Sequence, residues 1–497
     1  MSWRPPPAYN ARMPHARAGA GRTVVSLLLP AAGLLSGCYA AHQSRGGAQA
    51  QYTAATREVR PQDVAVPQGY RVEKVAEGLT FPTAVLFDDR DRVYVVESGY
   101  ASGESWAVPK LLRLEPHERF TTIAAGDKNG PWTGAVYHKG WFYVTEGGAL
   151  EGGRILRVDP DSGRATTLVS GLPSTGDHPT EPPAIGPDGY LYFGQGTHTN
   201  SGVVGDDNRR LGWVSRYPEA HDVPCRDVTL SGRNYATELG QTGAYLPLGT
   251  ASSANQVIKG RVPCSGAILR VPLEGKPEPE LVAWGFRDPF GLAFSPQGRL
   301  FAVDEGYDER GSRPVWGAAD LLWSVSTGTW YGWPDYSGDR PVATAEFKPV
   351  GGAPVAALLA SSPGKPPRPT AQFGVHSSAH GMDFSRSDSF GHVGEAFVAE
   401  YGDLAPFSGK VAGPVGFKVV RVDPDTGVIE DFAVNRGKRN GPASLVGGGG
   451  FERPVAVRFS PDGLSLYVVD FGVVTATEDG SQPHKGTGVL WRISRVE

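Results

Sequence analysis

The chain has 497 residues and a formal net charge of −4, and its residues are 40% hydrophobic and 20% charged. This balance is that of a globular protein, and the charge gives no reason to expect a nucleic-acid partner. Gly 67 and Pro 42 are abundant, which favours many turns and an all-β fold.

The N-terminal segment has the features of an export signal. Arg17 and Arg22 precede a short apolar run that ends in LSGC (35–38), and these four residues resemble the bacterial lipobox. The run is too short to span a bilayer comfortably. We predict a lipoprotein signal peptide over residues 1–38, a lipid anchor on Cys38 and a flexible tether over residues 39–66. A plain signal peptide, in which Cys38 is incidental, is the alternative.

One strand pattern recurs six times along the rest of the chain. Each copy is an apolar run of β-branched and aromatic residues that is stopped by a polar pair and a glycine, as in a buried strand that ends in a turn. Turns of the Pro-Asp-Gly kind precede several copies. The six copies are VYVVESG (93–99), WFYVTEG (141–147), YLYFGQG (190–196), LFAVDEG (300–306), AFVAEYG (396–402) and LYVVDFG (466–472).

A second series is interleaved with the first, and most of its members read as strand, acidic turn and strand. Its members begin with LLRLEP (111), ILRVDP (155), ILRVPL (268), LLWSVS (321), VVRVDP (419) and VLWRIS (489). Six units of strand plus hairpin predict an all-β, six-bladed β-propeller over residues 67–497. The last unit stops after one strand, so we expect residues 69–79 to supply its outer strand and to close the ring. A β-sandwich with coincidental turns is the alternative.

One spacing in the repeat is too long, and residues 200–263 form the excess. We predict that this excess is an insertion between blades. It contains Cys225, and Cys264 follows directly. In an exported protein with only these two cysteines beyond Cys38, we expect them to form a disulfide that staples the insertion. Two separate buried thiols are the alternative.

The polar residues that stop the first series of strands are candidates for a site in the central channel. A cluster this acidic needs a cation such as calcium, or arginines such as Arg287 and Arg453, to balance its charge. The alternative is that many of these side chains cap turns or face solvent. The candidates are Glu97, Glu146, Gln195, Asp304, Glu305, Glu400 and Asp470.

Several motifs, in order over residues 70–495, resemble one family. They include GDHPTEPPAIGPDGYLYFGQG, AWGFRDPFGLAF, DEGYD, YGWPD and GFERPVAVRFSPDG. Together they resemble the soluble glucose/sorbosone dehydrogenases, six-bladed propellers that carry pyrroloquinoline quinone (PQQ) and calcium. The resemblance implies that His178 is the catalytic base, that Asp177 orients its imidazole, and that Arg287 stabilises charge on the quinone oxygen.

The same resemblance implies the residues around the cofactor. The backbone carbonyls of Gly306 and Tyr307 would bind calcium, with Asp308 as an added ligand. Arg453 matches the arginines that pair with the PQQ carboxylates. His376 and His380 lie in a pocket-lining loop as site residues or, alternatively, as a zinc pair.

This sequence also departs from the family pattern. Asp288 stands where the family has asparagine, and Glu305 and Tyr307 replace an amide or histidine and a proline. A lysine that is expected after the fifth strand is missing. These changes make the predicted pocket unusually acidic for a cofactor that bears three carboxylates.

We therefore expect a periplasmic, PQQ- and calcium-dependent dehydrogenase that oxidises an aldose or related sugar by hydride transfer. The chain has no Cys-x-x-Cys-His haem motif, so electrons would leave to a separate acceptor. Two other readings stay open. One is a non-catalytic lipoprotein that binds carbohydrate or protein, and the other is a metal-dependent lactonase.

Overall fold

The computed structural model describes residues 57–99, 106–148, 150–409 and 411–496. The predicted signal peptide and the predicted anchor at Cys38 lie outside the described residues. Within these residues, no helix has the length and apolar character needed to cross a membrane.

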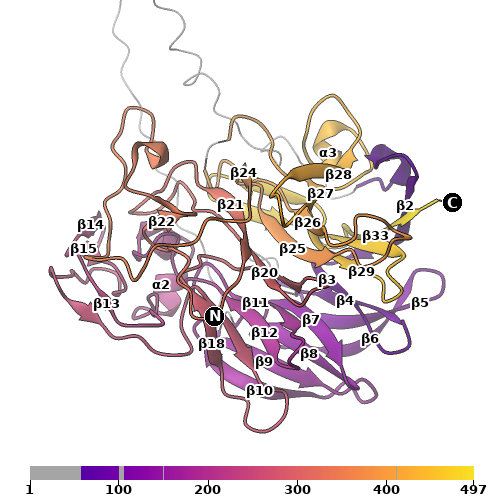
Figure 1. Ribbon diagram of the computed structural model, residues 1–497, viewed down its shortest axis with the longest axis horizontal. Coiled ribbons are helices and arrows are strands. Elements are labelled where there is room, and N and C mark those ends of the chain that lie inside the picture. The colour runs from indigo at the N-terminus through magenta and orange to yellow at the C-terminus, as the bar shows by residue number, and fades with distance from the viewer. Residues whose placement is uncertain (1–56, 100–105, 149, 410, 497) are drawn as a thin grey trace, which may run out of the picture. The chain divides into compact units, whose positions relative to one another are not determined.

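Six antiparallel sheets of four main strands form the blades of a β-propeller (Figure 1), which confirms the predicted fold. Blades 1 to 3 contain β3 (Pro82–Phe87), β4 (Val93–Glu97), β5 (Lys110–Glu115) and β6 (Arg119–Ala125); β7 (Trp132–His138), β8 (Trp141–Glu146), β9 (Gly153–Val158) and β10 (Ala165–Leu172); and β11 (Thr180–Ile185), β12 (Leu191–Gln195), β17 (Ala267–Val271) and β18 (Glu280–Trp284). Blades 4 to 6 contain β19 (Gly291–Phe294), β20 (Leu300–Asp304), β21 (Ala319–Ser324) and β24 (Ala371–Val375); β25 (Ala379–Phe384), β26 (Ala396–Glu400), β27 (Lys418–Val422) and β28 (Ile429–Asn435); and β29 (Pro454–Phe459), β30 (Ser465–Asp470), β33 (Gly488–Arg495) and β2 (Tyr70–Leu79).

The first strands of the six blades, β3, β7, β11, β19, β25 and β29, lie side by side in a ring around the propeller axis. The predicted first series of strands forms the second strand of each blade. The predicted hairpins form the third and fourth strands of blades 1, 2, 3 and 5, whereas the fourth strand of blade 4 is the distant β24 and that of blade 6 is β2. The loops that enter the first strands therefore gather at one end of the ring, and this end holds most of the predicted site.

The ring is closed as the sequence predicted. β2 pairs antiparallel with β33, which also pairs with β30, so an N-terminal strand completes the C-terminal blade. The predicted tether is too long at its C-terminal end. β1 (Val64–Ala65) pairs with β28 as a fifth strand of blade 5, and the buried guanidinium of Arg57 contacts Asp470 at 2.9 Å. A strand of two residues is too short to appear as an apolar run in the sequence.

The hydrophobic core is divided into six clusters, each of which fills the space between two neighbouring blades. In β20, Leu300 and Ala302 pack toward blade 3, whereas Phe301 and Val303 pack toward blade 5. Successive residues of a strand face opposite sides of its sheet. Both faces of each blade are buried, which explains the uninterrupted apolar runs that made the repeat visible in the sequence.

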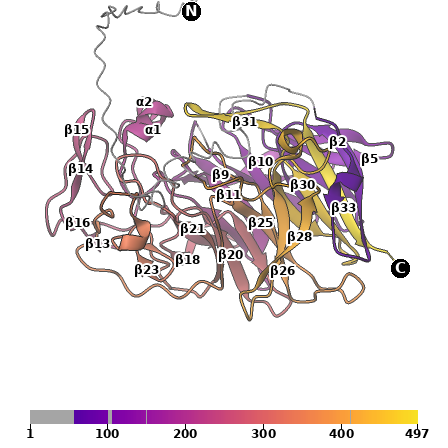
Figure 2. The ribbon, with the colours of Figure 1, turned by 90° about the horizontal axis from the view of Figure 1, so that it is seen from above.

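The insertion joins β12 to β17, which are hydrogen-bonded neighbours in blade 3. The prediction that it lies between blades is therefore wrong, because the long spacing falls inside one repeat unit. The insertion contains α1 (Asp206–Arg210), α2 (Trp213–Arg216), β13 (Val228–Thr229), β14 (Asn234–Thr237), β15 (Gly240–Gly243) and β16 (Val257–Ile258). In Figures 1 and 2, β13, β14 and β15 lie on the side of the propeller away from β2 and β33.

Short elements fill the remaining loops. They are the 3₁₀ helices η1 (Pro61–Asp63) and η2 (Ala345–Phe347), the helix α3 (Ala443–Val446), and the strands β22 (Tyr336–Ser337), β23 (Arg340–Pro341), β31 (Val474–Thr477) and β32 (Gly480–Pro483).

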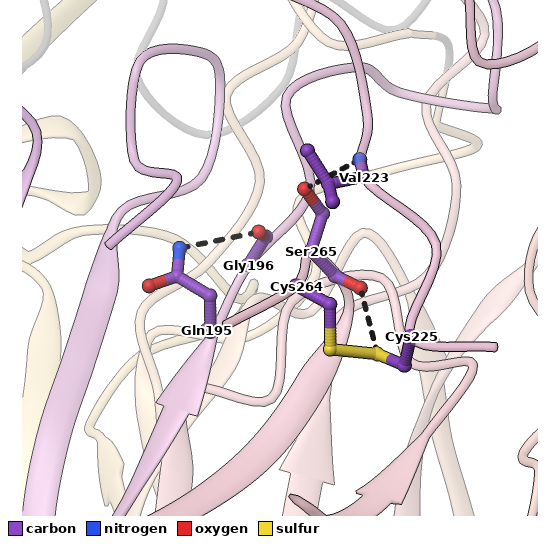
Figure 3. Close-up of a disulfide and its surroundings, with 6 residues drawn as sticks. All are labelled: Gln195, Gly196, Val223, Cys225, Cys264 and Ser265. Atoms are coloured by element: carbon purple, nitrogen blue, oxygen red, sulfur yellow. Dashed lines mark hydrogen bonds between the residues drawn. A yellow bond between two sulfur atoms is a disulfide. The ribbon is translucent and has the colours of Figure 1, made fainter. Parts of the chain in front are cut away.

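The predicted disulfide between Cys225 and Cys264 is present, with an S–S distance of 2.02 Å (Figure 3). Beside it, the backbone N–H of Val223 donates a hydrogen bond to Ser265 Oγ at 3.1 Å. The bond ties the first half of the insertion to the residues that lead into β17.

Removal of the disulfide should destabilise the protein through chain entropy. The two cysteines are 39 residues apart, and a closed loop of this size contributes about 4 kcal/mol. We expect the double variant C225S/C264S to lose about that free energy of unfolding in urea titrations. A reductant should lower the wild-type value similarly and leave the variant unchanged. Equal stability of the two proteins would contradict the assigned role.

Candidate active site

His178 lies on the loop that enters β11 and is 6% exposed. Its Nδ1 is 2.9 Å from the backbone carbonyl of Thr197 and 3.0 Å from Thr197 Oγ1. A carbonyl only accepts hydrogen bonds, and the Thr197 hydroxyl already donates to the carbonyl of Thr199 at 2.7 Å. Nδ1 must therefore carry the hydrogen, which leaves the lone pair on Nε2. Nε2 makes no hydrogen bond to any residue that the structure describes, so this nitrogen is available as a base.

Glycine at position 196 makes room for this arrangement. A Cβ atom on Gly196 would lie 2.3 Å from His178 Cβ and 2.9 Å from Asp288 Oδ1. Any larger residue would displace both side chains. The backbone N–H of His178 also donates to the Thr197 carbonyl at 3.1 Å, so main chain and ring are held by the same residue.

Electrostatics keep the imidazole neutral. Burial lowers the pKa of His178 well below its usual value, and the positive charges of Arg287 and Arg310 lower it further. A proton on the ring would be both desolvated and repelled. At neutral pH the side chain is thus an unprotonated acceptor.

Asp177 does not orient His178, and this part of the prediction is wrong. Its carboxylate accepts a hydrogen bond from Asn208 Nδ2 at 3.0 Å and pairs with Arg310 Nη1 at 2.7 Å. Adjacent residues on an extended loop point in different directions, so sequence neighbours need not touch. Asp177 instead ties the His178 loop to α1 and, through Arg310, to the loop after β20.

Arg287 lies at the centre of a chain of alternating charges and is 3% exposed. Its Nη2 donates to Asp308 Oδ2 at 2.8 Å, and Nε and Nη2 contact Asn200 Oδ1 at 3.2 and 3.1 Å. Arg310 Nε meets the same Asp308 oxygen at 2.9 Å. Burial opposes ionisation of Asp308, but Arg287 and Arg310 lower its pKa to about 2. Its carboxylate is therefore already bound by two guanidinium groups, which does not suit the added calcium ligand suggested by the sequence.

The polar residues that stop the second strands mostly hold loops in place. Asp304 Oδ1 accepts the backbone N–H groups of Arg287 and Asp288 at 3.0 and 2.8 Å. Asp470 Oδ1 accepts the N–H of Arg453 at 2.9 Å. Three others do the same for the loops that enter β3, β7 and β11, namely Glu97 with Thr80, Glu146 with Asn129 and Trp132, and Gln195 with Thr180 and Pro173.

Blade 5 departs from this pattern. Its entering loop is held by Asp320 of blade 4, whose Oδ2 accepts hydrogen bonds from Ser377 Oγ at 2.7 Å and from the N–H of Ala379 at 3.0 Å. Burial raises the pKa of Glu400, the residue that ends the second strand of this blade, to about 7. The turn-capping alternative therefore holds for most of the candidate carboxylates.

Glu305 reaches the site with its side chain. Its Oε1 accepts a hydrogen bond from His380 Nε2 at 2.6 Å, and Oε2 lies 3.9 Å from Arg287 Nη1. His380 stacks on Phe290, with ring centroids 4.1 Å apart. Burial opposes ionisation of Glu305, but His380 and Arg287 lower its pKa. Glu305 is thus an ionised carboxylate between two positively polarised partners.

His376 has a different environment from His380. Its Nδ1 and Nε2 lie 3.8 Å from Asp308 Oδ1 and from Glu309 Oε1 respectively. The two histidines contact different carboxylates, and the described residues contain no group of three or more His, Cys, Asp or Glu side chains that could hold a metal ion. The geometry of the described residues does not favour the zinc pair.

Two carboxyl groups are buried near the ends of two inner strands, one on Glu181 of β11 and one on Asp288 in the loop that enters β19. Glu181 is 0% exposed and Asp288 is 5% exposed, and neither oxygen of Glu181 has an N–H or O–H partner among the described side chains. Burial and the charge of Asp288 raise the pKa of Glu181 well above its usual range. Burial and the charge of Glu305 likewise raise the pKa of Asp288 well above its usual range. The pair carries at most one negative charge, so the site has less negative charge than the number of its acidic residues suggests.

Arg453 has unused hydrogen-bond donors. Its Nη1 donates to the carbonyls of Gly402 and Asp403 at 2.8 and 3.1 Å. Nε and Nη2 are buried and have no acceptor among the described residues. The guanidinium also lies 4.8 Å from the ring of Tyr401, which is 5.2 Å from the ring of His380. An anionic group beside Arg453 would satisfy two buried donors that are otherwise unpaired.

Gly306 and Tyr307 offer backbone oxygens. The Gly306 N–H donates to Asp320 Oδ1 at 2.8 Å, and the Tyr307 hydroxyl donates to the Tyr336 carbonyl at 2.8 Å. No N–H or O–H group among the described residues donates to the carbonyl oxygens of Gly306 and Tyr307. Carbonyl oxygens are ligands that calcium prefers. Together with the orphaned donors of Arg453, they are compatible with an anionic cofactor and a cation.

The sequence analysis missed four residues that build this site: Thr197, Asn200, Arg310 and Glu181. Thr197 and Asn200 directly follow the glycine-rich end of β12, a position where polar side chains enter the site. Glu181 lies within the motif GDHPTEPPAIGPDGYLYFGQG, but its residue type gave no sign that it would be fully buried. Arg310 gave no signal, because the contacts that define its role come from segments far apart in the sequence.

No protein-family model matches the chain. Quinoprotein glucose dehydrogenase B of Acinetobacter calcoaceticus is 26% identical over 172 residues, which are 34% of this chain and 29% of that protein. The resemblance to quinoprotein sugar dehydrogenases is confirmed over this part of the chain, which spans less than a third of the relative.

Two solved structures share the fold. The holo form of the pyranose dehydrogenase PQQ domain from Coprinopsis cinerea superposes with a TM-score of 0.52 at 16% identity, covering 87% of this chain and 97% of that one. The calcium structure of Trichoderma reesei Carbohydrate-Active Enzymes Family AA12 gives a TM-score of 0.51 at 16% identity, covering 88% and 98%. These likenesses establish the propeller fold.

The protonated Glu181 should make stability fall as pH rises. The folded protein holds a proton that the unfolded chain releases above about pH 4.3, so the contribution is present at low pH and is lost toward high pH. Between about pH 7.5 and 8.5, His178 is neutral in the folded protein and almost fully neutral in the unfolded chain, where a histidine has a pKa of about 6.5, so it adds almost no slope of its own. We expect Glu181→Gln to flatten the decrease in unfolding free energy over this range by about 1.4 kcal/mol per pH unit.

Urea denaturation at a series of pH values measures this slope. Glu219→Gln, which changes an exposed carboxyl group, should leave the slope as in the wild type. A Glu181→Gln protein with the wild-type slope would show that Glu181 is ionised in the folded state.

Proposed function

We propose that this protein is an exported, PQQ- and calcium-dependent dehydrogenase that oxidises an aldose or related sugar. The observation that carries the proposal is the imidazole of His178, whose hydrogen is held on Nδ1 by Thr197 so that Nε2 is left as a base. The partial similarity to a quinoprotein glucose dehydrogenase supports the same reaction class.

The cofactor would be held by residues that have unused bonding capacity. Nε and Nη2 of Arg453 would pair with a PQQ carboxylate, and the carbonyls of Gly306 and Tyr307 would bind calcium. When bound, PQQ supplies the acceptor for hydride and calcium polarises it. Protonation of the Glu181–Asp288 pair removes one of the charges that would repel an anionic cofactor.

His178 would take the proton from a sugar hydroxyl while hydride leaves the carbon that bears this hydroxyl. Its lowered pKa keeps it unprotonated at neutral pH, and the carbonyl of Thr197 stabilises the imidazolium through the Nδ1 hydrogen. Arg287 is fixed by Asn200 and Asp308, so its guanidinium would present a positive charge at a constant position.

Electrons would leave to a separate acceptor, and export and lipidation at Cys38 remain predictions from the sequence. The proposal gives no role to a lactonase centre or to a purely carbohydrate-binding propeller. Absence of both PQQ binding and dye reduction by the purified protein, with calcium and a panel of sugars, would overturn it.

Replacement of His178 should greatly slow catalysis and leave cofactor binding unchanged. We expect His178→Gln to reduce PQQ- and calcium-dependent dye reduction by a factor of about 10² to 10⁴ and to retain PQQ absorbance after gel filtration. In the wild type, the acid limb of kcat/KM should lie below about pH 6.5, the ordinary histidine value, because burial and two arginines lower the His178 pKa.

His117→Asn is the control, since His117 is exposed on the turn between β5 and β6 and has the positive φ of 63° that asparagine tolerates. This variant should behave as the wild type. Undiminished dye reduction by His178→Gln would remove the base from the proposed mechanism.

Arg453 is expected to act on cofactor affinity. Arg453→Gln removes buried charge-assisted donors, and we expect PQQ to bind at least about tenfold more weakly in equilibrium titrations of the calcium-loaded apoprotein. Arg492→Gln, at a partly exposed arginine paired with Glu73, should leave the affinity unchanged. Equal affinity for wild type and Arg453→Gln, with the fold retained by melting temperature, would exclude this pairing.

A further inference from the structure

A cavity lies at the end of the propeller away from His178. His178, Arg287 and Arg453 lie just before the first residues of β11, β19 and β29. The cavity is instead lined by the last residues of the inner strands, including Phe87 of β3 and Ile185 of β11. A strand of six residues is about 17 Å long from its first to its last Cα atom. The two sites are therefore separated by the length of the inner strands.

Among the lining residues, Asp383 carries the one carboxylate, and this group already has its own hydrogen-bond donors. Asp383 accepts the backbone N–H groups of Phe384 and Phe459 at 2.8 and 3.0 Å and pairs with Arg386 Nη1 at 2.9 Å. Burial opposes its ionisation, but Arg458 and Arg386 lower its pKa. Asp383 thus remains ionised, and the positive charge of Arg386 balances its negative charge.

Arg386 is held rigidly in the wall. Besides its bond to Asp383, it donates through Nη1 to the carbonyl of Phe384 at 2.9 Å and through Nη2 to the carbonyl of Phe294 at 2.8 Å. Both carbonyls belong to the ends of inner strands. Three of the five N–H groups of this guanidinium are therefore bound to acceptors in the wall.

Arg458 is the lining residue whose guanidinium has the most free hydrogen-bond donors for a ligand. Its Nε lies 3.8 Å from Asp383 Oδ2, beyond hydrogen-bond distance, and it makes no hydrogen bond to any residue that the structure describes. Its side chain is 43% exposed. With two arginines and one neutralised aspartate, the cavity has an excess of positive charge and a free planar set of donors that suits a carboxylate.

Most of the other lining residues are apolar, and Tyr137, His138 and Ser460 add polar groups. Leu86, Phe87, Val136, Ile185 and Phe294 line the two adjoining parts of the cavity, and the larger part has a volume of about 290 Å³. This volume is at the lower end of the range that holds small ligands. We propose that this cavity binds a small organic carboxylate, with its carboxylate on Arg458 and its apolar body against the ends of the inner strands.

The proposal is independent of the catalytic one and is tested by binding. The probe is 4-fluorobenzoate, observed by ¹⁹F NMR with the full-length protein. We expect line broadening that saturates, and a dissociation constant at least about tenfold higher for Arg458→Gln. The neutral 4-fluorobenzyl alcohol should bind more weakly by a similar factor. Inorganic phosphate, which has no apolar body, should not displace the probe at equal concentration.

Arg492→Gln is again the matched control, since its side chain is similarly exposed at 38% and lies on the outer side of blade 6. It should bind the probe as the wild type does. Sugar oxidation should be unchanged in Arg458→Gln. Binding that survives Arg458→Gln, equal binding of the alcohol, displacement by phosphate, or no binding at millimolar probe would each overturn the proposal.

Discussion

The candidate active site depends on one repeated contact, in which a polar side chain at the end of a second strand accepts hydrogen bonds from the loop that enters the same blade. In this way Asp304 holds the backbone of Arg287, and Asp470 holds the backbone of Arg453. A buried carboxylate is stable only when hydrogen bonds replace its lost hydration. The contact therefore fixes two things together, the end of a core strand and the position of a site residue.

Charge balance is the second constraint on this site. Asp308 pairs with the guanidinium groups of Arg287 and Arg310 and remains ionised, because these groups lower its pKa to about 2 against the effect of burial. Asp304 accepts two backbone N–H groups instead, and burial raises its pKa to about 7. The acidic appearance of the sequence thus overstates the negative charge of the pocket, because burial converts part of it into neutral carboxylic acid.

The fold could be predicted to a large extent because each blade is buried on both faces. Runs such as Leu300–Val303 pack toward two neighbouring blades in alternation, so a complete apolar pattern is required at every repeat. The place of the insertion could not be read in the same way. A long loop between β12 and β17 and a long loop between two blades leave the same spacing, and only the hydrogen-bonded register separates them.

The sequence by itself determined the number of blades, the closure of the ring, the disulfide and the segments that carry His178, Arg287 and Arg453. These features follow from local patterns and from chemistry that is restricted to a few residue types. The tertiary structure decided the partners of the site side chains: Thr197 for His178, Arg310 for Asp177, and Asp308 for Arg287. Such pairs join loops that are distant in the chain, and the direction of each side chain is set by packing in the assembled ring.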